Sequence, residues 1–233
     1  MLNLCTPSTV AVAVALTSSV HAAATITNAT MFANFNHNIS GVFPNGSDSD
    51  SDGITPDPFP QNLSVSSALS LAPTSNGSFM NGLSNGSATI RDDGANGSAS
   101  YQFEYLRGGT GSVNGTIRLT VIFTVTGGTG YELDAVFFDN NLAGSQVRIT
   151  EEGTNAFVAG TTTGDNLSLS GTLGDGTYRL TAQISHGNSG SPTFIGRTIQ
   201  QQMQYDLRFT EIPAPSGLML TACAAFATIR RRR

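Results

Sequence analysis

The feature that most constrains this chain is a regular alternation of apolar and polar residues over several separate segments. In residues 117–125 every second side chain is apolar, and the side chains between them are polar apart from Ile122. The same two-residue period covers residues 101–105, 178–184 and 203–209. Because successive side chains of a β-strand point to opposite faces, this period predicts strands that are buried on one face only.

Shorter segments carry the same pattern, and helical periodicity is almost absent. Gly, Ser, Thr and Asn separate the segments, so we expect about ten strands joined by short turns. Further strand candidates are residues 63–71, 87–90, 131–138, 146–150, 157–159 and 167–173. Strands without intervening helices predict an all-β fold, an antiparallel β-sandwich of jelly-roll type.

Two kinds of segment are expected to lie between the strands. Asn-Gly favours the centre of a type I′ hairpin turn, because both residues tolerate a positive φ. The sequence therefore predicts turns at each Asn-Gly, and several small hairpins or a ruffled edge within residues 76–100. Residues 45–61 are acidic, rich in proline and poor in apolar residues, and predict a long surface loop. The Asn-Gly pairs begin at Asn45, Asn76, Asn81, Asn85, Asn96 and Asn114.

The two ends of the chain differ from the alternating segments. Residues 10–16 are apolar and are followed by small residues suited to cleavage after Ala22 or Ala23, which predicts a signal peptide over residues 1–23. Near the other end, two prolines precede an apolar run over residues 217–229. As a helix this run would measure roughly 20 Å, against about 30 Å for the hydrocarbon core of a bilayer, so it predicts a transient rather than a permanent span. The closing arginines are expected to stay on the cytoplasmic side. The residues that define this segment are Pro213, Ala214, Pro215, Arg230, Arg231, Arg232 and Arg233.

The order of proline motif, short apolar helix and arginine cluster resembles the PEP-CTERM sorting signal of Gram-negative bacteria. Ala214 stands where that motif has a glutamate. The resemblance covers residues 212–233 and implies processing by an exosortase-type enzyme in the inner membrane. It also implies transfer to the cell surface or extracellular matrix, in connection with exopolysaccharide and biofilm. It implies nothing about the domain over residues 24–211.

The charge of that domain excludes one class of partner. Four of the 11 basic residues are the closing arginines, so the rest of the chain carries 16 acidic residues against seven arginines, a formal charge of −9. The chain has no lysine. Such a protein is a poor match for the phosphate backbone, and we expect no nucleic-acid binding. Cys5 and Cys223 both lie in the terminal segments, so we expect no disulfide in the domain.

One acidic cluster has the spacing of metal ligands. Asp48, Asp50 and Asp52 alternate with serines and precede Gly53, as in the opening half of an EF-hand loop. The closing glutamate is missing, and Asp57 is the nearest further carboxylate. The sequence thus predicts either a solvated acidic linker or a structural Ca²⁺ site; no other cofactor is expected.

Catalytic chemistry is hard to assemble from this sequence. His37 and His186 are too few and too distant for a zinc site, and no Gly-x-Ser-x-Gly elbow is present. Paired carboxylates for glycoside hydrolysis are available in principle. We therefore expect a non-enzymatic exported surface protein. The alternatives are a glycan-binding module, with Ca²⁺ as a stabiliser, and a glycoside hydrolase. The carboxylates available to a hydrolase are Glu104, Glu132, Asp134 and Asp139, and the tyrosines available to a sugar platform are Tyr101, Tyr105, Tyr131, Tyr178 and Tyr205.

Overall fold

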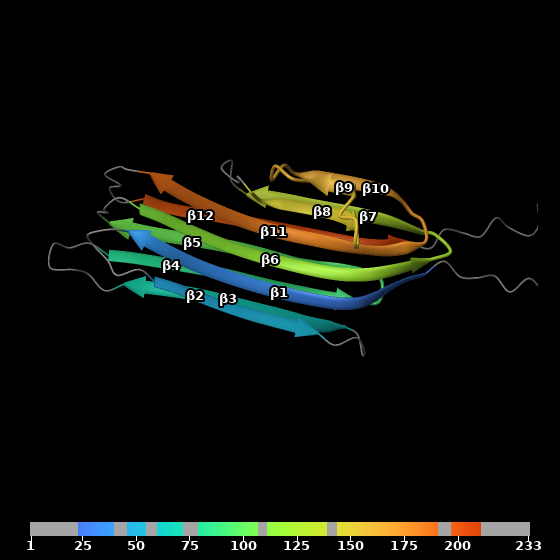
Figure 1. Cartoon of the computed structure of the whole chain (residues 1–233), viewed down its shortest axis with the longest axis horizontal. Coiled ribbons are helices and arrows are strands. Elements are labelled where there is room, and N and C mark those ends of the chain that lie inside the picture. Colours follow the sequence, from blue (N-terminus) through green and yellow to red (C-terminus); the bar gives the residue numbers. More distant parts are fainter. Residues whose placement is uncertain are drawn as a thin grey trace, which may run out of the picture. The chain divides into compact units, whose positions relative to one another are not determined.

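A computed structural model of the protein describes residues 23–39, 46–54, 60–71, 79–106, 111–138, 144–190 and 197–210. These residues form twelve strands and no helix (Figure 1). The predicted signal peptide and the predicted sorting signal lie outside the described residues. The strands are β1 (Ala23–Ile39), β2 (Gly46–Ile54), β3 (Gln61–Leu71), β4 (Phe79–Arg91), β5 (Gly94–Leu106), β6 (Gly111–Thr126), β7 (Thr129–Phe138), β8 (Gln146–Glu151), β9 (Phe157–Thr161), β10 (Leu167–Leu173), β11 (Gly176–Gly190) and β12 (Arg197–Thr210).

The strands form two six-stranded antiparallel sheets. The first sheet has the order β2-β1-β6-β11-β8-β9, and the second has the order β10-β7-β12-β5-β4-β3. Figure 1 looks through both layers, so that β2 overlaps β3 and β11 overlaps β12, and these pairs are also in contact. One hydrophobic core draws residues from both sheets. The predicted antiparallel β-sandwich is therefore confirmed.

The strand pairing of the second half of the chain is nested. β8 pairs with β9, β7 with β10, β6 with β11, and β5 with β12. β1 and β2 extend the first sheet beyond β6, and β3 and β4 extend the second sheet beyond β5. Each sheet consequently ends in an early strand at one edge and in a late strand at the other.

The predicted alternation decides which face each central strand buries. All five apolar residues of the period in residues 117–125 are buried, and Val121 and Phe123 have no exposed surface. Residues 178–184 show the same pattern, with Leu180 and Ile184 buried and Arg179 half-buried on the opposite face. Each fully buried side chain of this size stabilises the fold by about 1.5–3 kcal/mol.

The prediction of turns at Asn-Gly is wrong for the four pairs that the structure describes. Asn81-Gly82 and Asn85-Gly86 lie within β4, and the pairs at Asn96 and Asn114 lie within β5 and β6. In each pair the glycine lies on the inner face. A Cβ at Gly82 would lie 2.0 Å from Cζ of the buried Phe35 ring. Gly82 and Gly86 are needed because large side chains of the facing sheet fill the space over them.

Gly115 in β6 shows the same arrangement. A Cβ there would lie 1.9 Å from Cε2 of the buried Tyr101 ring. At Gly97 in β5 a Cβ would lie 2.3 Å from Oη of Tyr205. Tertiary packing therefore overrides the turn preference of the dipeptide. The pairs at Asn45 and Asn76 lie outside the described residues.

The prediction of a loop over residues 45–61 is wrong for β2, which pairs with β1 along its whole length. β1 itself carried no strand prediction. Its inward residues alternate small with large, as at Ala29 and Met31, and a bulge between Ile26 and Asn28 interrupts the period. Residues 55–59 of the predicted loop lie outside the described part of the chain.

Candidate binding groove on the second sheet

The outer face of the second sheet is hollowed into a polar groove of about 730 Å³. Strands β3, β4, β5, β12 and β7 all contribute to its lining. In each strand, outward side chains alternate with buried neighbours, such as Leu63, Ala88 and Ala135. The groove is therefore formed by the polar half of the same alternation that forms the core.

Strand register aligns these polar side chains in rows across the sheet. One row joins Asn62, Thr89, Asn96, Asp206 and Asp134 as successive cross-strand partners. Thr89 Oγ1 donates a hydrogen bond to Asn62 Oδ1 at 2.9 Å. Cross-strand contacts of this kind fix side-chain positions and stabilise a sheet by roughly 0.2–1 kcal/mol each.

The next row along the strands joins Ser64, Ser87, Ser98, Gln204 and Val136. The hydroxyls of Ser87 and Ser98 lie 3.1 Å apart, within hydrogen-bonding distance. Together the two rows present hydroxyl and amide groups in a repeating array. Such groups hydrogen-bond both as donors and as acceptors, as the hydroxyls of a sugar do.

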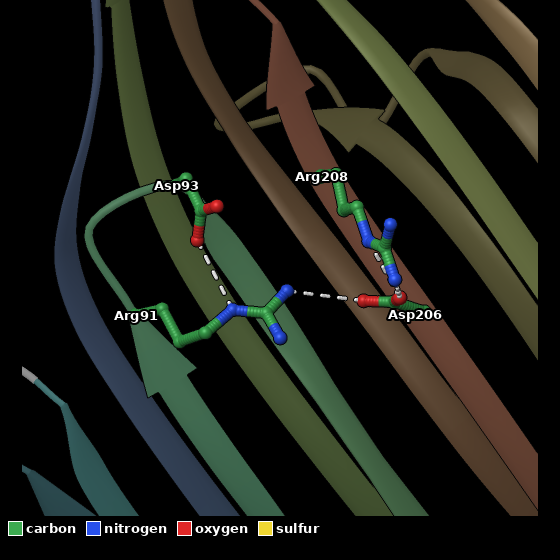
Figure 2. Close-up of polar contacts among 4 residues, drawn as sticks. All are labelled: Arg91, Asp93, Asp206 and Arg208. Atoms are coloured by element: carbon green, nitrogen blue, oxygen red, sulfur yellow. Dashed lines mark hydrogen bonds and ion pairs between the residues drawn. The ribbon is translucent and has the colours of Figure 1, made fainter.

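An ionic network shares Asp206 with the lining of the groove (Figure 2). Arg91 of β4 donates to Asp93 at 3.0 Å and to Asp206 Oδ1 at 3.1 Å. Arg208 binds Asp206 Oδ2 through Nε at 2.8 Å and Nη2 at 2.6 Å. Asp206 raises the pKa of the Arg208 guanidinium, through its side-chain hydrogen bond first and its charge second. The network links the turn between β4 and β5 to β12.

The groove holds two carboxylates, of Asp134 and Asp206, which are direct cross-strand partners. Both oxygens of Asp206 are engaged by arginines, whereas Asp134 is exposed and has no ion-pair partner among the described residues. Two-carboxylate hydrolysis needs one group as an acid and one as a base or nucleophile. The groove thus offers a single uncommitted carboxylate.

The other proposed hydrolase carboxylates are distributed differently. Glu132 lies on β7 opposite Arg208, and Glu104 lies on β5 opposite Thr198. Neither of them lines the groove. Asp139 lies outside the described residues. Of the three carboxylates that the structure describes, one, Asp134, lines the groove, beside Asp206, which the sequence analysis did not name.

Burial excludes four of the five tyrosines from a surface platform for sugars. Tyr101, Tyr131, Tyr178 and Tyr205 are all core residues, with at most 8% of their surface exposed. Burial raises the pKa of Tyr101 and of Tyr205. The side chain of Tyr105 lies outside the described part. Any sugar bound in the groove would be held by polar side chains instead.

The proposed calcium ligands lie on β2, the edge strand of the first sheet, which contacts the groove strand β3. Asp50 Oδ2 accepts a hydrogen bond from the Ser66 amide and Asp52 Oδ2 accepts one from the Ser64 amide, both at 2.9 Å. Among the described residues no group of three or more His, Cys, Asp or Glu side chains could hold a metal ion. The side chain of Asp48 and the whole of Asp57 lie outside that part, so calcium binding stays a prediction.

His186, one of the two histidines of the domain, is a core residue. It is buried and stacks on Tyr101, with ring centroids 5.5 Å apart. Its Nδ1 lies 3.2 Å from Nε2 of the buried Gln201. This position is closed to a substrate, and the side chain of His37 is not described.

The residues of the sorting signal, Pro213 to Pro215 and Arg230 to Arg233, fall outside the described residues. The described ranges contain no helix that is long and apolar enough to cross a membrane. The groove itself was not predicted, because the alternation identifies outward residues without giving the register that aligns them. Comparison with protein-family models, with curated proteins and with solved structures finds no match to this chain.

Proposed function

We propose that this chain is an exported, non-enzymatic protein of the cell surface or extracellular matrix. A signal peptide over residues 1–23 directs export, and residues 212–233 act as a PEP-CTERM-type sorting signal for an exosortase-type enzyme. The observation that carries the proposal is the order of Pro213-Ala214-Pro215, the apolar residues 217–229 and Arg230 to Arg233.

The limits of the folded unit support this assignment. The strands begin at Ala23 and end at Thr210, within a compact unit over Ala22–Ile212. Cleavage after Ala22 or Ala23 and release near Ile212 would therefore remove no strand. The domain also holds neither cysteine of the chain, so its stability rests on the buried core and strand pairing.

The sandwich is of the jelly-roll type in this proposal. A jelly roll is an eight-stranded antiparallel pair of sheets with two Greek keys. The nested pairs β5–β12, β6–β11, β7–β10 and β8–β9, divided alternately between the two sheets, support this topology. β1 to β4 would then be an addition at one side of the roll.

A fractionation experiment tests the sorting assignment. Cells would express the full chain or a version that ends at Glu211, and an antibody to the domain would follow both. The proposal predicts surface display of the full chain and loss of that display for the truncated chain. A matched variant with Arg230 to Arg233 replaced by Ser tests the arginine cluster alone. Equal display of all three chains would overturn the assignment.

The polar groove favours a second candidate function, glycan binding at the surface or in the exopolysaccharide matrix. Its rows of hydroxyl and amide groups match the hydrogen-bonding groups of a neutral sugar chain. Asp134 adds one carboxylate, which disfavours anionic sugars and suits neutral or amino sugars. Orientation by polar groups predicts weak binding, since Tyr205, the aromatic residue among the described lining, is buried in the core and offers no ring face to a sugar.

A glycan array probed with protein extracted from the surface tests this candidate. Gln204→Ala removes an exposed amide of the groove, whereas Gln183→Ala removes the same group on the outer face of the first sheet. Glycan binding in the groove predicts a several-fold weaker signal for the first variant and no change for the second. A blank array removes the glycan candidate and leaves the sorting assignment intact.

Melting curves with Ca²⁺ and with a chelator test the calcium prediction, and identical curves would exclude it.

A further inference from the structure

One edge of the sandwich differs from the rest of the surface. We call it the neutral edge, and it consists of β9 and β10, the last strands of the first and second sheets. Within the described ranges, every large hydrophobic side chain that is exposed lies on β7, β9 or β10. These side chains are Val136, Phe138, Phe157, Val158 and Leu169, with 36% to 57% of their surface exposed.

The neutral edge also lacks the charge that protects most sheet edges. Neither Phe157–Thr161 nor Leu167–Leu173 contains a charged residue. Natural edge strands usually carry charges that prevent pairing with another chain. The domain as a whole has a formal charge of −9, so two copies repel each other over most of their surfaces. The uncharged edge is where a second copy meets least repulsion.

The sequence of β10 is close to palindromic about Ser170. If two copies of Leu167–Leu173 pair in antiparallel fashion about that residue, Leu167 lies opposite Leu173 and Ser168 lies opposite Thr172. Leu169 lies opposite Gly171, and Ser170 lies opposite itself. Apolar or small residues thus meet one another on one face, and hydroxyls meet on the other. A slip by one residue would place leucine opposite serine and destroy this match.

We propose that β10 is a self-association strand, which pairs with β10 of a second copy about a two-fold axis at Ser170. The pairing continues the second sheet across the dimer and satisfies the backbone groups at the free side of β10. It also brings together the exposed Leu169 side chains, and β9, which contacts β10, lies beside the junction. This inference is independent of the sorting signal.

Asp165 and Asp175 lie two residues outside the ends of β10, beyond the paired residues, and the acids of β7 do not oppose the junction. Glu132 and Asp134 lie on β7, one strand inward from Ser170 and Ser168. In the dimer, β7 of one copy and β7 of the other are three strand spacings apart, roughly 14 Å. This separation exceeds the Debye length of about 8 Å at physiological ionic strength, so the repulsion is largely screened.

Cross-linking through single cysteines tests the register. In a full-length chain whose own Cys5 and Cys223 are replaced by Ser, Ser170→Cys places two thiols on paired residues, whose Cβ atoms are about 4.5–5.5 Å apart. A short bifunctional thiol reagent should then convert most of the protein to a covalent dimer. Ser168→Cys is the matched control, because its two copies would lie roughly 13 Å apart along the strands. Equal cross-linking of both variants, or of neither, would overturn the proposed register.

A charge variant tests the dimer itself by sedimentation or light scattering. Ser170→Glu places two like charges opposite each other, each beside Glu132 of its own β7, and should weaken the dimer at least tenfold. Gln102→Glu adds the same charge on the outer face of the central strand β5 and should leave the dimer unchanged. Circular dichroism reports whether either variant is folded. A wild-type chain that is monomeric at all concentrations, or equal behaviour of the two variants, would overturn the proposal.

Discussion

The two edges of the sandwich use the same two-residue period for opposite purposes. At the aspartate edge, formed by β2 and β3, Asp50 and Asp52 alternate with serines and accept hydrogen bonds from the backbone amides of Ser66 and Ser64. At the neutral edge, serines alternate with leucines in β10 and no charge is present. The aspartate edge is closed by its own side chains. The neutral edge leaves one side of each outer strand available to another molecule.

The packing behind the aspartate edge is unusual as well. Phe35 of β1 lies directly over Gly82 of β4, and Met31 lies close to Gly86. At the other side of the sandwich, branched residues such as Val147, Ile149 and Leu180 fill the core. The glycine-rich strands of this protein are therefore tightly packed core strands. We therefore expect substitutions to cost more on the side of the aspartate edge.

The largest expected effect comes from Gly82→Ala. The added Cβ would lie 2.0 Å from the Phe35 ring, which is fully buried and packs against the rings of Tyr101 and Phe103. We expect a loss of about 3 kcal/mol or more in the free energy of unfolding, measured with urea. Gly174→Ala, in the turn before β11, is the control, since nothing lies within 4 Å of its Cβ. Similar losses at both positions would contradict the packing described for β4.

The second effect concerns the aspartate edge. The Asp50→Ala/Asp52→Ala double variant removes both acceptors from the β3 amides, and we expect a loss of about 1–3 kcal/mol in unfolding free energy. In this variant the amides of β3 have lost these acceptors, so two copies of the protein should associate through β3 at high protein concentration. Asp50→Asn/Asp52→Asn keeps an acceptor oxygen at each position and should lower the free energy of unfolding by less.

Asp134→Ala is the control, because Asp134 is an exposed carboxylate without an ion-pair partner among the described residues. It should change the free energy of unfolding by less than about 0.5 kcal/mol. If Asp134→Ala lowers the free energy of unfolding as much as the double alanine variant does, the hydrogen bonds of Asp50 and Asp52 do not stabilise the edge.

A third effect is the loss of stability in alkali. Burial raises the pKa values of Tyr101 and Tyr205, so the folded protein retains protons that the unfolded chain releases above pH 10. Stability is then complete below pH 10 and falls as pH rises, by up to about 1.4 kcal/mol per pH unit for each tyrosine. Tyr205→Phe should reduce this slope, and it should cost little at pH 7 because Tyr205 Oη has no hydrogen-bond partner among the described residues. Urea unfolding between pH 9 and pH 11 measures the slope, and an unchanged slope would contradict the burial of this hydroxyl.

The smallest effect is expected at the ionic network between the β4–β5 turn and β12. Arg91→Lys keeps the charge but loses the planar fork that reaches Asp93 and Asp206 together. Because these side chains are partly exposed, we expect a loss of about 0.5 kcal/mol, which high salt should reduce. Urea unfolding at low and high salt checks this value. If Arg91→Lys lowers the free energy of unfolding more than Asp50→Ala/Asp52→Ala does, the ionic network matters more than the aspartate edge, contrary to this prediction.

The sequence predicts the central strands well because their inward residues are large. Phe123, Leu180 and Leu207 mark their faces unambiguously, and all three are fully buried. The same reasoning fails where the inward residue is small or the outward residue is charged. In β4 the inward Gly82 suggested a turn, and in β2 the alternation of aspartate and serine suggested a linker or a metal loop.

The candidate groove could not be predicted for a different reason. Asn62, Asn96 and Asp134 are outward residues in three segments that are far apart in sequence, and only strand register places them in one row. The register depends on long-range pairing, for which the local period carries no information. The nearly palindromic β10, by contrast, is visible in the sequence, but its position at a sheet edge is not.

The intact mass of the protein recovered from the cell surface decides whether the chain is exported and sorted as proposed. Export and sorting predict a product that begins near Ala23 or Ala24 and lacks the closing arginines, and therefore retains every strand of the sandwich. Recovery of the uncut chain of 233 residues from the cytosol alone would contradict the account.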